Sequence, residues 1–124
     1  MVPLTSTDAV RRARPDSPAL HRLKSEDGQS QAYVFAFDGA ERALARFFFP
    51  QGGSFLEDPA TGSATANFGG WCIATGRTLP LALTILQGDM VGRPSHLYLN
   101  VSAERRIEVG GDVIEIGRGS IRLD

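Results

Sequence analysis

The chain has 124 residues, 42% of them hydrophobic, and its thirteen basic and fourteen acidic residues give a formal net charge of -1. This length and apolar content predict one domain with one hydrophobic core, which we assign to residues 1–124. No window gathers the run of about five or six like charges that is typical of polyanion-binding segments, so we expect no nucleic-acid partner.

The cysteine content and the N-terminal residues indicate the cellular compartment of the protein. Cys72 is the only cysteine, which excludes an internal disulfide and a multi-cysteine metal site and is typical of a reducing cytoplasm. The first residues lack the basic and apolar regions of a secretory signal. The longest weakly polar run, residues 60–74, contains Asn67 and three glycines and is shorter than the ~20 apolar residues of a membrane span. We therefore expect a soluble cytoplasmic protein without a membrane partner.

The first part of the chain predicts a short strand followed by two surface helices. Residues 2–4 alternate as a strand does, and a helix is expected over residues 9–13, closed by Pro15. A second start signal at Ser17 predicts another helix, which should end at Asp27 before a glycine.

Hydrophobic residues then change to a period of two, which predicts a strand over residues 31–37 that is buried on both faces. A second aromatic-rich strand is expected over residues 43–49, ended by Pro50 and followed by a loop over residues 51–59. The small residues over 61–76 predict a helix enclosed by other elements, because a helix that is apolar on all sides is a buried one.

Further strands are expected toward the C-terminus, separated by glycine-bearing turns. They cover residues 81–87, 95–102, 106–109 and 112–116, with Gly110-Gly111 in the last turn. The predicted architecture is α+β: a curved, mainly antiparallel sheet wrapped around one central helix.

Residues 57–64, with the sequence Glu-Asp-Pro-Ala-Thr-Gly-Ser-Ala, hold the candidate site. Pro59 disfavours helical dihedrals at Asp58, and the backbone turns into the buried helix at Gly62 and Ser63. The first N–H groups of a helix have no intrahelical partner, and together with the helix dipole they favour a carboxylate or phosphate. Asp58 would stand beside that anion site with a carboxyl group that can exchange protons, as a general acid does.

A purely structural alternative accounts for the same residues. Asp58 and Thr61 would then cap the helix, and Gly62 would relieve a tight turn. The residue types and their spacing alone favour this structural interpretation.

The same segment resembles the signature of the PhzF-like isomerases of phenazine biosynthesis, a branch of the diaminopimelate epimerase fold that works without catalytic cysteines. Further matches occur in the order of that family, at residues 46–50, 87–88, 92–95 and 109–111 and at Gly117. Residues 1–124 as a whole resemble the C-terminal domain of the family, and no segment resembles its N-terminal domain.

The resemblance implies an isomerase that uses no metal and no organic cofactor, with its substrate between two such halves. It implies that Asp58 transfers a proton and that Thr61, Gly62 and Ser63 bind the carboxylate of a small substrate. The reaction class would be that of trans-2,3-dihydro-3-hydroxyanthranilate isomerase.

A chain that forms one half should leave part of an interdomain surface uncovered. We expect that surface to include Phe55, Leu56 and the turn over residues 87–93. The partner would be an N-terminal half polypeptide or, in a two-fold homodimer, a second copy of the chain.

The general-base glutamate and the histidine of the family belong to its N-terminal half. His21 falls in an expected surface helix and His96 begins a strand, so neither is expected to be catalytic. Glu57 neighbours Asp58, but adjacent residues of a strand point to opposite sides, so we do not assign it as the missing base. One hypothesis is therefore an isomerase half, and the other is a catalytically inactive carboxylate-binding or scaffold domain.

Overall fold

The structure, a computed structural model, describes residues 1–15, 17–22, 28 and 30–122. In chain order its elements are β1 (Val2–Pro3), α1 (Thr7–Arg12), α2 (Ser17–Arg22), β2 (Ala32–Phe37), β3 (Arg42–Gln51), β4 (Ser54–Asp58), α3 (Gly62–Ala74), β5 (Leu81–Gln87), the 3-10 turn η1 (Asp89–Val91), β6 (Ser95–Val101) and β7 (Ile107–Gly111). The predicted end of the second helix, at Asp27, lies outside the described residues. No helix within the described ranges is long and apolar enough to cross a membrane.

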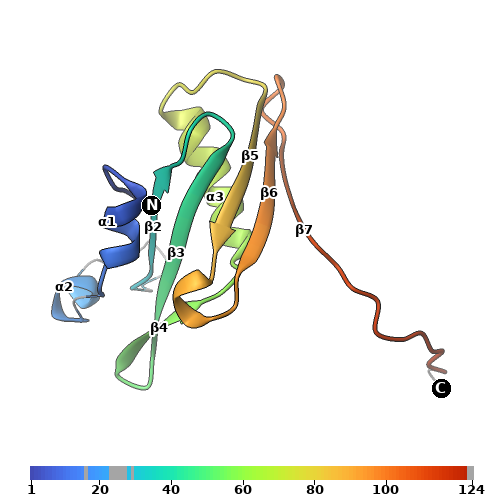
Figure 1. Cartoon of the computed structure of the whole chain (residues 1–124), viewed down its shortest axis with the longest axis horizontal. Helices are drawn as coiled ribbons and strands as arrows, with labels where there is room; N and C mark the ends of the chain where they lie inside the picture. Colours follow the sequence, from blue (N-terminus) through green and yellow to red (C-terminus); the bar gives the residue numbers. More distant parts are fainter. Residues whose placement is uncertain (16, 23–27, 29, 123–124) are drawn as a thin grey trace.

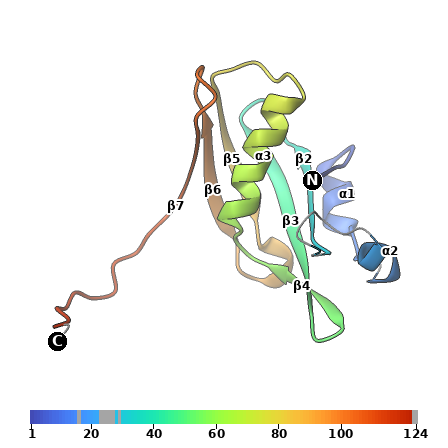
Figure 2. The ribbon, with the colours of Figure 1, turned by 180° about the vertical axis from the view of Figure 1, so that it is seen from behind.

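The strands form one mixed sheet in the order β1-β2-β3-β5-β6-β7, and β4 pairs with the far end of β3. The β2–β3, β3–β4, β5–β6 and β6–β7 pairs are antiparallel, whereas β1–β2 and β3–β5 are parallel. Helix α3 runs along one face of the sheet, and α1 covers the other face beside β2 and β3 (Figure 1; Figure 2). The predicted α+β arrangement, a mainly antiparallel sheet around one central helix, is confirmed.

Strand β2 separates two hydrophobic clusters, where the sequence predicted one core. Tyr33 and Phe35 join the larger cluster under α3, whereas Val34 and Ala36 join a second cluster with Val10 of α1. Alternate side chains of a strand point to opposite faces, so a strand that is apolar at every position needs cover on both sides. Helix α1 supplies the second cover through Val10, which is 0% exposed.

Pro50 does not end β3, and the predicted loop over residues 51–59 is wrong. Strand β3 continues through this proline, and β4 folds back on it through a Gly52-Gly53 turn. Both glycines have positive φ, 58° and 82°, as a two-residue type I′ hairpin turn requires. The proline is tolerated because β2 pairs with β3 only as far as Phe48, so the end of β3 is paired on one side.

The last two predicted strands differ from the structure. β7 (Ile107–Gly111) includes both glycines of the predicted turn, whereas residues 112–116 form no strand. Val113, Ile114 and Ile116 are 93%, 84% and 99% exposed. Within the described ranges no further strand lies beside β7. In the described part of the chain the apolar segment has no neighbour to pair with, and it runs away from the sheet (Figure 1).

Helix α3 approaches the sheet closely at a glycine. A Cβ on Gly69 would lie 3.0 Å from Ile107 Cγ2 and 3.1 Å from Leu99 Cδ1, whereas a Cβ on Gly70 would meet nothing within 4 Å. Both glycines lie in the interior of α3. The effect of helix propensity is therefore the same at the two positions, and only the surroundings differ. A methyl group at Gly69 would therefore press on the Ile107 and Leu99 side chains, which would have to shift by a few tenths of an ångström.

Alanine at each of these glycines should separate packing from helix propensity. Gly70→Ala should raise the free energy of unfolding by about 0.5–1 kcal/mol, because alanine is the better helix former. Gly69→Ala has the same gain but forces two side chains to move, at a cost of about 1–3 kcal/mol. Urea denaturation should therefore rank Gly69→Ala below Gly70→Ala, and equal stability of the two variants would contradict the close approach.

Candidate active site

The candidate segment joins the end of β4 to the start of α3. Strand β4 ends at Asp58 and α3 begins at Gly62. In the hairpin, Glu57 lies opposite Phe48 and Asp58 lies opposite Phe47. Paired residues share a face of the sheet and successive residues alternate. Because Phe48 belongs to the cluster under α1 and Phe47 packs on the cluster under α3, Glu57 faces α1 and Asp58 faces α3.

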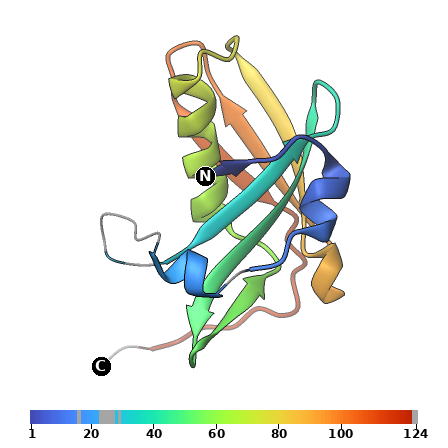
Figure 3. The same cartoon turned by 90° about the vertical axis from the view of Figure 1, so that its left-hand side faces the viewer.

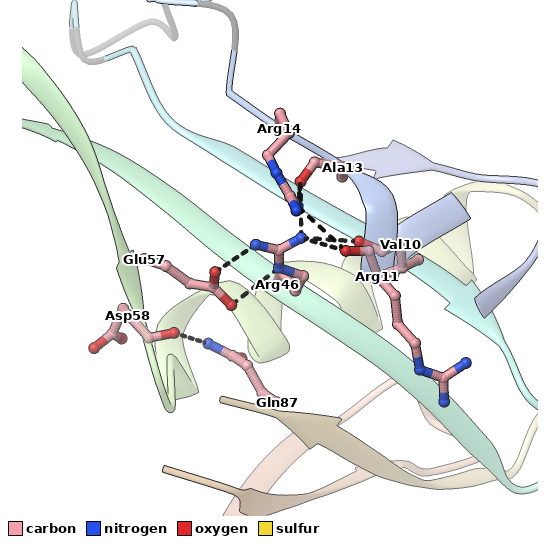
Figure 4. Close-up of polar contacts among 8 residues, drawn as sticks. All are labelled: Val10, Arg11, Ala13, Arg14, Arg46, Glu57, Asp58 and Gln87. Carbon is pink, nitrogen blue, oxygen red and sulfur yellow. Dashed lines mark hydrogen bonds and ion pairs between the residues drawn. The ribbon is translucent and has the colours of Figure 1, made fainter. Parts of the chain in front are cut away.

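Glu57 forms a buried ion pair with Arg46 (Figure 4). The guanidinium donates from Nε and Nη2 to the two carboxylate oxygens, at 3.0 and 2.6 Å. Its Nη1 donates to the carbonyls of Val10, Arg11 and Ala13 at the end of α1, at 3.1, 3.1 and 2.8 Å. Both side chains of the pair are only 7% exposed. Glu57 is thus held on the side of the sheet away from α3, as the strand alternation predicted.

Asp58 points away from Glu57 (Figure 4) and bonds to the residue that precedes α3. The hydroxyl of Thr61 donates to Asp58 Oδ2 at 2.6 Å. Thr61 occupies the N-cap position of α3, but its side chain makes no capping bond to the helix N–H groups. The hydroxyl therefore ties the carboxylate to the helix terminus and leaves the terminus itself uncapped.

A buried glutamine bonds to both Asp58 and Thr61. It was not among the residues predicted for the site. Gln87, at the end of β5, is 0% exposed. Its Nε2 donates to the backbone oxygen of Asp58 at 2.7 Å and to Thr61 Oγ1 at 2.9 Å, and its Oε1 accepts from the N–H of Thr61 at 3.4 Å. One signal in the sequence could have indicated it: Leu83 and Ile85 are the preceding buried positions of β5, and a polar residue continues their period.

The N–H groups of Gly62 and Ser63 have no hydrogen-bond partner among the described residues. The first N–H of the helix to be bonded is that of Thr65, which donates to the carbonyl of Thr61 at 3.0 Å. Ser63 is exposed and Gly62 is half-buried. The structure thus brings the four predicted site residues, Asp58, Thr61, Gly62 and Ser63, together at an uncapped helix N-terminus, where free N–H groups and the helix dipole favour an anion. Their catalytic and substrate-binding roles stay predictions.

Neither His96 nor Cys72 bonds to this terminus within the described part of the chain. His96 lies on β6, with Nδ1 3.9 Å from an Asp112 carboxylate oxygen, and its side chain is 53% exposed. Cys72 is buried in α3, about 15 Å along the helix from its start, and burial raises the pKa of its thiol. His21 lies in α2, as expected.

Residues 1–119 match the family described as phenazine biosynthesis-like protein, PhzC-PhzF. The chain belongs to this PhzF-like family. The match includes the segment between β4 and α3 and most of the extended C-terminal residues.

Curated relatives of the PhzF-like chain are considerably longer than it is. An uncharacterized isomerase of Pasteurella multocida is 40% identical over 121 residues, which cover 98% of this chain and 40% of the relative. A trans-2,3-dihydro-3-hydroxyanthranilate isomerase of Pseudomonas fluorescens is 35% identical over 127 residues, which cover 98% of this chain and 44% of the relative. The chain therefore spans less than half the length of each of these relatives.

A solved structure shows the same fold. The phenazine biosynthesis protein of Bacillus anthracis, of the PhzF family, matches 86% of this chain and 39% of its own with a TM-score of 0.60 and 17% sequence identity. Together with the mixed sheet and the few helices, this likeness identifies the α+β fold as diaminopimelate epimerase-like, as predicted.

Removal of the buried guanidinium should destabilise the protein strongly. Arg46→Met keeps a long apolar side chain but leaves Glu57 charged, buried and unpaired, which should lower the free energy of unfolding by about 3–5 kcal/mol. Arg42→Met is the matched control on the same face of β3, because the ion pair of Arg42 with Asp38 is exposed, at 59% and 45%. That change should cost at most about 1 kcal/mol. Urea denaturation measures both, and a similar small loss for the two variants would contradict the structural role of Arg46.

Proposed function

We propose that this PhzF-like chain is half of a cofactor-independent isomerase that transfers a proton on a small carboxylate substrate. Asp58 would transfer the proton, and Thr61, Gly62 and Ser63 would form the terminus that receives the substrate carboxylate. The observation that carries the proposal is the position of the Asp58 carboxyl beside the uncapped N-terminus of α3. The name of the Pseudomonas relative supports an acid similar to dihydro-hydroxyanthranilate as the substrate.

The surroundings of Asp58 leave one carboxylate oxygen for chemistry. Oδ2 accepts the Thr61 hydroxyl, whereas Oδ1 bonds to none of the described residues. A substrate carboxylate bound to the N–H groups of Gly62 and Ser63 would lie against the first turn of α3, beside Asp58. General acid–base catalysis requires that kind of proximity, within hydrogen-bond reach of the proton that moves.

A second polypeptide would supply the rest of the active site. The resemblance to the family implies a general-base glutamate, and Glu57 is held by Arg46 on the opposite side of the sheet. The chain also spans only 40% and 44% of the two relatives. We propose an N-terminal half polypeptide as the partner, with a homodimer as the alternative arrangement, in the cytoplasm.

One exposed apolar residue near Asp58 fits such a partner, although the predicted lining needs correction. Leu56 is 46% exposed and shares the Asp58 face of β4. Phe55 lies on the opposite face, where it packs on the cluster under α1. Gln87 is buried, and the η1 turn that follows it lies on the side of the sheet away from α3 (Figure 3).

A catalytically inactive carboxylate-binding or scaffold domain is the second candidate function. It is favoured by the ion pair of Glu57 with Arg46, which removes the neighbouring carboxylate from the face that carries Asp58. A helix terminus with a single carboxyl group can bind an anion without exchanging its protons. Proton exchange on a substrate therefore separates the two candidates.

Asp58→Asn should abolish proton exchange in the completed enzyme. The rate of deuterium incorporation from heavy water, on a panel of cyclic and linear carboxylates, should fall by about 100-fold or more, because general acid–base catalysis contributes about 10²–10⁴-fold. Asp89→Asn, an exposed change in η1, is the control. Each chain is mixed with a polypeptide that corresponds to the remaining part of the relatives. Exchange retained by Asp58→Asn would support the purely structural role, and no exchange in any mixture would support the inactive domain.

Leu56→Glu should weaken association through the face that bears Asp58. Burial of a leucine side chain contributes about 1.5–3 kcal/mol, so the dissociation constant should rise by roughly tenfold or more. Ala82→Glu is the matched control, because Ala82 is exposed on the face of β5 that points away from α3. Analytical ultracentrifugation of the chain, alone and with the supplied half, measures the change. A chain that stays monomeric at high micromolar concentration and does not associate with the supplied half would show that the domain stands alone.

A further inference from the structure

The orientation of the Gln87 carboxamide follows from the groups that surround it. The backbone oxygen of Asp58 only accepts hydrogen bonds, so the group 2.7 Å from it is Nε2. The backbone N–H of Thr61 only donates, so the group that faces it, at 3.4 Å, is Oε1. A flipped carboxamide would lose both contacts, and the two backbone groups therefore fix the amide in one orientation.

This orientation also sets the direction of the Thr61 hydroxyl. Nε2 of Gln87 donates to Thr61 Oγ1 at 2.9 Å, so the hydroxyl oxygen is an acceptor in that contact. Its single proton is then donated to Asp58 Oδ2, 2.6 Å away, within the range of a charge-assisted hydrogen bond. We propose that Gln87 and Thr61 are positioning residues for Asp58: this relay engages Oδ2 and leaves Oδ1 as the oxygen that transfers the proton.

The relay rests on the proposed function and revises one residue within it. A hydroxyl has one proton, and the proton of Thr61 is donated to Asp58. Thr61 therefore has none to donate to a substrate carboxylate and acts through Asp58. The carboxylate is then held by the N–H groups of Gly62 and Ser63 and by the Ser63 hydroxyl.

Close packing keeps the relay dry and in place. Gln87 is 0% exposed and Thr61 is 9% exposed, so water competes little for these hydrogen bonds and each is stronger than it would be in solvent. The next residue, Gly88, has φ of 89°, and a Cβ there would lie 2.7 Å from Pro59 O and would also overlap Arg93 O. The end of β5 is thus packed directly against the connection between Asp58 and α3.

Nuclear magnetic resonance of the chain tests the relay without any need for enzymatic activity. The side-chain amide resonances of Gln87 should shift in one step as Asp58 titrates, because ionisation changes the Thr61 hydrogen bond in which Nε2 takes part. Asp58→Asn should abolish the step, which distinguishes it from titration of Glu57 nearby. Thr61→Val keeps the side-chain shape without the hydroxyl and should lose most of the shift, and Thr61→Ser should restore it.

If the Gln87 side-chain amide resonances of the wild-type chain do not shift over this titration, the relay is wrong. This outcome does not depend on the folding of any variant. A Gln87 shift in Thr61→Val that equals the wild-type shift would also overturn the relay. In the completed enzyme, Thr61→Val should lower kcat by up to about 100-fold at unchanged KM, with recovery in Thr61→Ser. A rise in KM alone would overturn the relay, because it would place the hydroxyl on the substrate. If no mixture shows turnover, the proposed function fails and the Gln87 titration still decides the relay.

Discussion

One buried guanidinium fixes how the β3–β4 hairpin lies on the sheet. Removal of Arg46 and Glu57 from water costs several kcal/mol per ion. The pair offsets this cost because all three guanidinium nitrogens donate hydrogen bonds. The guanidinium contacts both carboxylate oxygens, the carbonyls of Val10, Arg11 and the capping residue Ala13 at the end of α1, and the ring of Phe48, whose centroid lies 4.8 Å away. The carbonyls at the end of a helix carry partial negative charge, so the same cation also holds α1. With Glu57 fixed on that side, Asp58 faces α3.

The candidate site is then assembled from three elements that meet at one end of α3. Strand β4 brings Asp58, β5 brings Gln87, and the helix brings its free N–H groups. Strand β2 bonds to the first turn of α3 through Tyr33. The Thr65 hydroxyl donates to the carbonyl of Thr61 at 3.0 Å and accepts from the Tyr33 hydroxyl at 3.3 Å. Burial raises the pKa of Tyr33 to about 12, so this donor keeps its proton at neutral pH. These hydrogen bonds join the first turn of α3 to the sheet.

Local patterns in the sequence predicted the parts of the fold that local chemistry decides. The period of two over β2, the small-residue helix and the segment around Asp58 all correspond to features of the structure. The pairing of Arg46 with Glu57 was not predicted, because partners that are distant along the chain leave no periodic trace. Gln87 was not predicted for the site, although it continues the buried period of Leu83 and Ile85. The Gly52-Gly53 hairpin signal was present but was outweighed by Pro50. Residues 112–116 carry a strand pattern but have no neighbouring strand among the residues that the structure describes. Such a pattern indicates a need for pairing and not the pairing itself.

Titration of the chain with a small carboxylate such as benzoate, at constant ionic strength, tests whether the start of α3 binds an anion. Amide resonances of Gly62 and Ser63 should show the largest shifts. Gly62→Pro, which removes one N–H at a helix position that tolerates proline, should weaken the binding. Shifts that occur elsewhere on the chain, with none at these two amides, would show that the start of α3 is not an anion site.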